Sequence, residues 1–170
     1  MDFKTLISDI PDFPKPGIIF RDISPILADP EAAEELINAF LDKWEGKIDA
    51  IVAIDARGFV LGGALFRDLS VPLVLVRKKG KLPGACTECA YDLEYGSSVL
   101  EMQKGSLKPG ARVLIVDDLL ATGGTAEAAC KLVLMQGAVV AGCAFVIELA
   151  GLGGREKLAG YEVQSLVTYE

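Results

Sequence analysis

The feature that most constrains the fold is a short apolar run that leads directly into two acidic residues. Residues 113–116 are apolar and mostly β-branched, which is typical of a buried strand in a parallel sheet. Asp117 and Asp118 follow, then a polar turn at residues 121–125, then a helical stretch from Ala126. Open α/β sheets bind ligands at the carboxyl ends of their strands. The pattern therefore predicts an α/β fold with two carboxylates at its binding edge.

The turn after these acids has the composition of an anion-binding site. Gly123 and Gly124 open the expected helix, and the first N–H groups of a helix have no partner within it, so they suit phosphate. Thr122 and Thr125 add hydroxyl groups. No lysine follows the glycines, which excludes a Walker loop. The alternative is an ordinary turn with solvated acids, but adjacent acids after a buried strand cost stability unless a ligand or hydrogen bonds use them.

A second strand delivers another loop to the same edge of the sheet. Residues 48–54 form this expected strand, and Asp55, Ala56, Arg57 and Gly58 follow it. Arg57 would offer its fork of donors to phosphate oxygens. Gly58 would let the backbone approach the ligand. Considered alone, the loop could equally carry an ordinary surface arginine.

Strands and helices alternate along the chain, which predicts a doubly wound, mainly parallel sheet with helices on both faces. The 170 residues suffice for a single domain with a full core. Further strands are expected at residues 18–23, 71–76, 97–103 (at the sheet edge), 138–149 and 161–167. Helices are expected at residues 2–10, 30–46, 59–69, 126–136 and 155–159.

Two segments do not fit this alternation. Residues 11–17 are rich in proline, which excludes regular helix, so the N-terminal part is expected to fold over the strand ends as a small cap. Residues 78–96 are polar and too long for a simple connection, which predicts a mobile flap. The basic cluster at residues 77–81 follows a strand, and this position favours a binding role over a solvated loop.

Composition excludes several classes of function. The net charge of −7 argues against a nucleic-acid partner, which requires a basic surface. The absence of histidine excludes His-based triads and His metal ligands. Cys86 and Cys89 form a C-x-x-C without a second pair at zinc spacing, so free thiols are expected, with a redox-sensitive loop as the alternative. No apolar run could span a membrane and no signal peptide is recognisable, which predicts a cytoplasmic location.

Several segments together resemble the type I phosphoribosyltransferases, in particular the members that act on adenine. Residues 113–125 resemble their signature for 5-phosphoribosyl pyrophosphate (PRPP), and residues 55–58 resemble their pyrophosphate loop. Other matches are residues 13–25 with the adenine-recognition hood, 77–84 and 91–96 with the two ends of the catalytic flap, and 154–158 with a C-terminal turn. These matches cover nearly the whole chain in the family's order. The main departure is residues 85–90, inside the flap.

The resemblance implies a fold, a reaction and partners. The fold would be that of the type I phosphoribosyltransferases, with a hood at about residues 1–28 and a flap at about residues 78–96. The reaction would transfer the 5-phosphoribosyl group from PRPP to adenine, giving AMP and pyrophosphate. Mg²⁺ would be required and would arrive with PRPP rather than in a protein metal site. A homodimer is implied, with neither nucleic acid nor membrane as a partner.

The resemblance also assigns roles to individual residues. Arg57 would stabilise the departing pyrophosphate, and Glu94 is the candidate acid–base group because adenine must lose a proton, although an exposed flap charge is the alternative. Tyr95 would gate entry or contact the phosphate. Contacts with phosphate and ribose are implied for Asp117, Asp118, Ala121, Thr122, Gly123, Gly124, Thr125, Asp55, Ala56, Arg57, Gly58, Arg77 and Lys81. Contacts with adenine are implied for Ile19, Phe20, Arg21 and Leu149.

Two other functions stay open on the sequence alone. The first is transfer to hypoxanthine, guanine, xanthine or orotate on the same fold, against which the hood and flap segments argue. The second is a non-catalytic regulator that binds PRPP and a nucleic acid, against which the acidic net charge argues.

Overall fold

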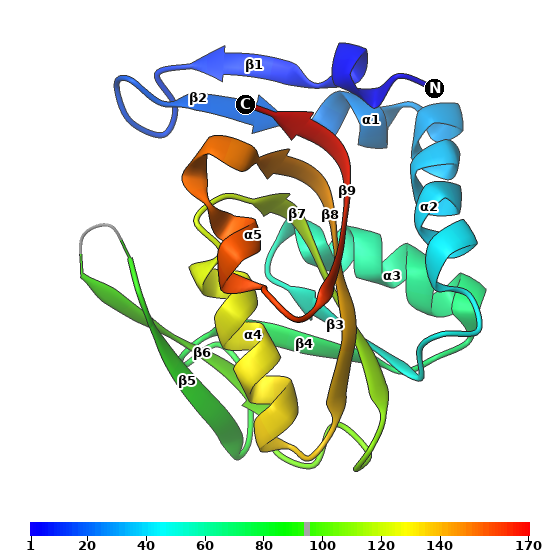
Figure 1. Cartoon of the computed structure of the whole chain (residues 1–170), viewed down its shortest axis with the longest axis vertical. Helices are drawn as coiled ribbons and strands as arrows, with labels where there is room; N and C mark the ends of the chain where they lie inside the picture. The colour runs from blue at the N-terminus through cyan, green and yellow to red at the C-terminus, as the bar shows by residue number, and fades with distance from the viewer. Residues whose placement is uncertain (94–95) are drawn as a thin grey trace. The chain divides into compact units, whose positions relative to one another are not determined.

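The computed structural model describes residues 1–93 and 96–170 (Figure 1). The chain forms two compact units, Met1–Lys43 and Trp44–Glu170. The expected single domain with an N-terminal hood stays a prediction. Among the described residues, no helix combines the length and the apolar character needed to cross a membrane.

The first unit contains a β-hairpin. β1 (Ser8–Pro11) pairs antiparallel with β2 (Ile19–Asp22), which confirms the strand expected at residues 18–23. The helix expected at residues 2–10 is wrong beyond its first turn, because the 3-10 helix η1 (Phe3–Leu6) ends before β1. So short a helix does not offset its nucleation cost, and strand pairing supplies the backbone hydrogen bonds instead.

Two helices complete this unit, α1 (Ser24–Ala28) and α2 (Pro30–Trp44), whose last residue is assigned to the second unit. Asp29 caps α2 as expected, since its Oδ1 accepts a hydrogen bond from the N–H of Glu31 at 3.0 Å. The residues predicted to form the apolar face of α2 include Leu36 and Phe40, which are both fully buried.

The second unit contains a seven-stranded sheet in the order β5-β6-β4-β3-β7-β8-β9. The strands are β3 (Ala50–Ile54), β4 (Leu73–Lys78), β5 (Cys86–Asp92), β6 (Ser97–Gln103), β7 (Arg112–Leu120), β8 (Val139–Leu149) and β9 (Glu162–Tyr169). The five strands from β4 to β9 in this order pair in parallel, and β6 and β5 are antiparallel to their neighbours. The expected mainly parallel sheet is confirmed.

Helices cover both faces of this sheet (Figure 1). α3 (Arg57–Leu69) packs so closely on one face that a Cβ on Gly62 would lie 2.8 Å from the Cβ of Ala53. α4 (Gly124–Met135) lies on the other face, in one buried cluster with Val52. Alternate residues of β3 thus face opposite helices, which explains why its sequence is apolar throughout. The short helices η2 (Ala150–Leu152) and α5 (Gly154–Lys157) follow β8.

The segment expected to be a mobile flap contains a regular strand, and its mobility stays a prediction. Its residues 86–92 form β5, which pairs with β6 from Cys86↔Gln103 to Asp92↔Ser97. β6 is therefore covered by β5 on one side and β4 on the other, and the expectation that β6 forms the sheet edge is wrong. A half-exposed edge strand such as β5 needs few apolar residues, so its sequence carries a weak strand signal.

Candidate active site

The two acids of the sequence signature lie on β7, beside the end of β3. β7 pairs with β3 only as far as Val116, whereas its pairing with β8 continues to Leu120. Asp117 and Asp118 are thus part of the strand, and the expectation that the strand ends before them is wrong. The longer partner β8 supplies hydrogen bonds past the point where β3 has ended. The acids consequently lie where, among the described residues, one side of β7 has no paired strand.

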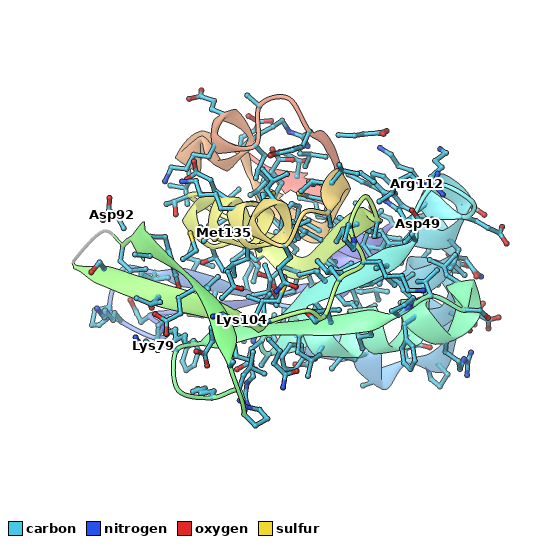
Figure 2. The ribbon with its side chains drawn as sticks, turned by 90° about the horizontal axis from the view of Figure 1, so that it is seen from below. Asp49, Lys79, Asp92, Lys104, Arg112 and Met135 are labelled. Atoms are coloured by element: carbon cyan, nitrogen blue, oxygen red, sulfur yellow. The ribbon has the colours of Figure 1, made fainter. Side chains whose placement is uncertain are left out.

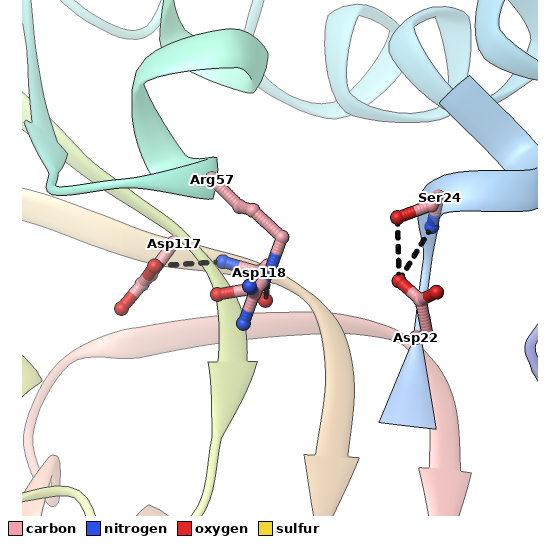
Figure 3. A network of polar contacts seen from close by, with 5 residues as sticks. All are labelled: Asp22, Ser24, Arg57, Asp117 and Asp118. Atoms are coloured by element: carbon pink, nitrogen blue, oxygen red, sulfur yellow. Dashed lines mark hydrogen bonds and ion pairs between the residues drawn. The ribbon is translucent and has the colours of Figure 1, made fainter. Parts of the chain in front are cut away.

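Arg57 is the first residue of α3 and reaches Asp118 from there. Its Nε donates a hydrogen bond to Oδ2 of Asp118 (Figure 3), whose side chain is only 10% exposed. A carboxylate with so little solvent requires such a partner. Gly58 allows the approach, because a Cβ there would lie 2.7 Å from the carbonyl oxygen of Val116. The backbone that lies close to Gly58 is therefore that of β7.

Asp117 is held differently from its neighbour. Its Oδ1 accepts a hydrogen bond from the backbone N–H of Asp118 at 2.9 Å. Burial raises the pKa of Asp117 well above its usual value, and the negative charge of Asp118 raises that pKa further. The charge of Arg57 opposes the shift without cancelling it. Strongly shifted acids of this kind are common at functional sites.

A cavity of about 490 Å³ includes these residues in its lining, which holds four basic and three acidic residues. Arg77 is oriented by Asp55, because its Nε donates to Oδ2 of Asp55 at 3.1 Å. The peptide bond between Asp55 and Ala56 is cis. The positively charged lining residues are Arg57, Arg77, Lys78 and Lys81, and the others are Ile54, Asp55, Ala56, Val76, Tyr91, Leu100, Asp117, Asp118 and Thr125.

Glu101 on β6 shapes the loop that carries Lys81, and sequence reasoning missed it. Its side chain accepts hydrogen bonds from the N–H groups of Gly80 at 3.0 Å and Leu82 at 3.1 Å. The carbonyl oxygen of Lys81 in turn accepts from Nη1 of Arg77 at 3.2 Å. Glu101 is only 4% exposed. Its partners are remote in sequence, so no local pattern marks its role.

A second cavity, of about 220 Å³, is lined by the turn between β7 and α4. Gly123 has a φ of 84°, a conformation that favours glycine, and as the N-cap residue it has no side chain to cover the first N–H groups of α4. An anion here would meet those groups and the positive end of the helix dipole. The predicted turn residues Ala121, Thr122, Gly123, Gly124 and Thr125 all line this cavity.

The two cavities share a wall. Arg57, Asp117, Asp118 and Thr125 line both of them. The structure therefore brings together the two predicted loops and the start of the predicted flap. Lys78 and Tyr91 also line the first cavity; neither was singled out in advance, although both belong to segments that were. Glu94 and Tyr95, the candidate acid–base and gating residues, lie outside the described residues.

The residues expected to bind adenine are divided between the two units. Phe20 packs edge-on against Phe13, with their ring centroids 5.3 Å apart. That the expected adenine contacts form one site stays a prediction. The residues concerned are Ile19, Phe20 and Arg21 on β2, and Leu149 at the end of β8. The expectation of free thiols is confirmed for all four cysteines.

Comparison with known proteins places this geometry in a family. The family model described as phosphoribosyl transferase domain matches residues 23–167. An adenine phosphoribosyltransferase of Nitrosococcus oceani is 52% identical over 98% of both chains. The crystal structure of adenine phosphoribosyltransferase from Thermoanaerobacter pseudethanolicus superimposes with a TM-score of 0.95, at 48% identity over 98% of both chains.

A third similar protein has been solved with small molecules bound. The adenine phosphoribosyltransferase of Saccharomyces cerevisiae, in complex with adenine and an imino-altritol bisphosphate, has a TM-score of 0.91 at 43% identity, and the match covers 96% of both chains. Matches of this identity and coverage extend over both units and the whole site. The chain therefore belongs to the phosphoribosyl transferase domain family and, within it, to the adenine phosphoribosyltransferases.

Proposed function

We propose that this chain transfers the 5-phosphoribosyl group of PRPP to adenine and releases AMP and pyrophosphate. One observation carries the proposal: two adjoining cavities share Arg57, Asp117, Asp118 and Thr125. The larger cavity has four basic residues in its lining, and the smaller one is lined by a helix N-terminus. PRPP has a matching distribution of groups, with a diphosphate and a 5′-phosphate on either side of a ribose diol. The relatives of about 50% identity are named for the same reaction.

The two cavities divide the substrate between them in this proposal. The diphosphate lies in the larger cavity, where Arg57, Arg77 and Lys81 donate hydrogen bonds to it. The 5′-phosphate lies in the smaller cavity against the N–H groups of residues 121–125. The ribose hydroxyls donate to Asp117 and Asp118 at the shared wall.

This placement also favours the transition state. As the bond to pyrophosphate breaks, positive charge develops on the ribose and negative charge develops on the leaving group. Asp117 and Asp118 stabilise the cationic ring electrostatically, and the guanidinium groups of Arg57 and Arg77 stabilise the leaving group. Arg57 is held in place before substrate arrives by its hydrogen bond to Asp118, so little reorganisation is needed.

Magnesium fits this site as an ion that enters with the diphosphate. The described residues contain no group of three or more Cys, Asp or Glu side chains arranged to hold a metal, and Asp118 already accepts a hydrogen bond from Arg57. Asp55 likewise accepts a hydrogen bond from Arg77, so the remaining oxygens of these lining carboxyls would meet a hard cation mainly through its water. When bound, Mg²⁺ would neutralise charge on the departing pyrophosphate.

For the base, we propose stacking on Phe20, with Leu149 on the other side and Ile19 and Arg21 reading the edge of the ring. Glu94 accepts the proton that adenine loses, since the chain has no histidine to do so. Tyr95 gates entry. This assignment rests on the family resemblance of the hood and flap segments.

We also propose a homodimer, as the resemblance implies. Val60 and Phe66 on α3 and Leu75 on β4 are exposed apolar side chains, and such residues are often covered by a partner. A sedimentation run that gives the monomer mass would remove this proposal. The cytoplasmic location stays a prediction from the sequence.

The experiment is pyrophosphate release from PRPP and Mg²⁺ with each nucleobase in turn. Release with adenine alone supports the proposed function and the base contacts. Release with another base keeps the PRPP site but contradicts the adenine assignment. Absence of release with every base, together with tight PRPP binding, would instead favour a PRPP-binding regulator.

A further inference from the structure

A buried carboxylate at the end of β8 is tied to the helix α5. The Glu148 side chain is only 7% exposed, and both of its oxygens accept from the guanidinium of Arg155, one of them from Nε at 2.9 Å. The hydrogen bonds from Arg155 hold the pKa of Glu148 below its usual value, although burial opposes this. Taking a carboxylate out of water is costly unless it is paired in this way.

Arg155 also connects α5 to β9. Its Nη1 donates to the carbonyl oxygen of Val163 at 3.2 Å, and its Nη2 lies 3.4 Å from Oγ of Ser165. One guanidinium thus joins the end of β8, the start of α5 and two residues of β9. Arginine can hold several partners in a fixed geometry because its five N–H donors form a rigid plane.

Gly154, the residue before Arg155, contacts the turn at residues 121–125, which we call the phosphate turn. A Cβ on Gly123 would lie 2.6 Å from the carbonyl oxygen of Gly154, and a Cβ on Gly154 would lie 3.1 Å from the backbone N of Gly123 and closer still to the carbonyl oxygen of Ala121. The two backbones are therefore in direct contact with no side chain between them. Any shift of α5 must be transmitted to the turn that lines the smaller cavity.

We propose that Arg155 is a positioning residue for the phosphate turn. Held by Glu148, it keeps Gly154 against residues 121–123 and so fixes where the N–H groups of the turn point. Arg155 does not line either cavity, and it acts without touching the substrate. The inference rests on the proposed function, because it assumes that the smaller cavity takes the 5′-phosphate.

The test compares two ligands that occupy different cavities. Binding of ribose 5-phosphate and of pyrophosphate is measured by calorimetry on the full-length wild type, Arg155→Met and Arg112→Met. Arg112 is a matched control, because it forms a similar multiple-hydrogen-bond pair with Asp49 but lines neither cavity. We expect Arg155→Met to weaken ribose 5-phosphate by about tenfold, with pyrophosphate and the Arg112→Met variant unchanged.

If Arg155→Met does not fold, Arg155→Lys replaces it in the same binding measurements. It keeps a positive charge beside Glu148, but one ammonium group cannot hold Glu148, Val163 and Ser165 together. This variant should therefore also weaken ribose 5-phosphate more than pyrophosphate, by a smaller factor than Arg155→Met does.

The possible failures can be told apart. If wild type binds ribose 5-phosphate and both Arg155 variants bind it equally well, the positioning role is wrong and the proposed function stands. If the variants lose both ligands equally, the effect is a general loss of structure and the inference is again overturned. If the wild type binds neither ligand, the proposed substrate site fails and the inference fails with it.

Discussion

Aspartate and arginine side chains meet at both ends of the parallel sheet, but the pKa of the aspartate is lowered at one end and raised at the other. At the amino end, Asp49 accepts hydrogen bonds from the backbone N, Nε and Nη2 of Arg112 at 2.9 to 3.0 Å (Figure 2). These bonds lower the pKa of Asp49 to about 2. At the carboxyl end, Asp117 and Asp118 share the charge of Arg57, and the pKa of Asp117 is raised.

The difference separates a structural ion pair from a binding site. A carboxylate with several donors from one arginine has its hydrogen-bonding capacity largely used within the protein. Two adjacent carboxyls beside one arginine retain acceptor capacity and a high local electrostatic energy, which a bound diol or cation would relieve.

The largest expected effect comes from Asp118→Asn. The change removes the negative charge that faces the ribose and the charged partner of Arg57, so turnover should fall by about 100-fold or more. The free energy of unfolding should fall by no more than about 3 kcal/mol, since one charged hydrogen bond is lost. Steady-state kinetics and urea unfolding measure the two effects. Wild-type turnover in this variant would contradict the ribose role.

Gly58→Ala should damage both stability and PRPP binding. The new Cβ would lie 2.7 Å from the carbonyl oxygen of Val116 and 3.3 Å from Oδ1 of Asp117, and forcing α3 away from β7 costs about 1–3 kcal/mol. Thermal melting and the KM for PRPP report the change.

Gly63→Ala is the control for this substitution. It lies on the same helix and its Cβ would have nothing within 4 Å. It should leave KM unchanged and stabilise the helix by up to about 1 kcal/mol. Equal destabilisation by both alanines would show that the contact with β7 is not the cause.

Asp117→Asn should separate stability from activity. Because the folded-state pKa of Asp117 is raised, its contribution to stability is present below the unfolded pKa and is lost as the pH rises through the folded pKa. At pH 7 the variant should therefore melt no lower than the wild type, while PRPP binding weakens. Melting curves at pH 7 and below pH 3.8 check this. A clear loss of Tm at pH 7 would mean that ionised Asp117 stabilises the free protein.

Asp49→Asn should have the smallest effect. The pKa of Asp49 is lowered, so its contribution is present above the unfolded value of 3.8 and is lost as the pH falls through about 2. The variant should lose that part of the acid dependence of unfolding, measured by urea midpoints across this range. Turnover should match the wild type, and a marked fall would mean that the amino end also contributes to the site.

The sequence predicted the carboxyl edge well because a parallel sheet gathers its strand ends there. Arg57, Lys81 and the residues of the 121–125 turn each follow a strand, and Arg77 lies at the end of β4. The structure places all of them around two adjoining cavities. Local patterns suffice for such residues, because topology alone brings them together.

Other features could not be predicted because remote partners determine them. β7 continues through its acids because β8 extends alongside it. β5 exists because β6 pairs with it, although its own sequence lacks an apolar alternation. Nothing in the local sequence distinguishes Glu101 and Glu148 from solvated acids. Their burial depends on donors that only the fold brings to them, which are backbone N–H groups for Glu101 and Arg155 for Glu148.

The most direct test of the account is calorimetric binding of Mg²⁺–PRPP to the wild type, Asp118→Asn and Asp49→Asn. If the carboxyl end is the substrate site and the amino end is structural, the wild type and Asp49→Asn bind equally, and Asp118→Asn binds at least about tenfold more weakly. Equal binding by all three proteins would contradict the assignment of the ribose to the acids of β7.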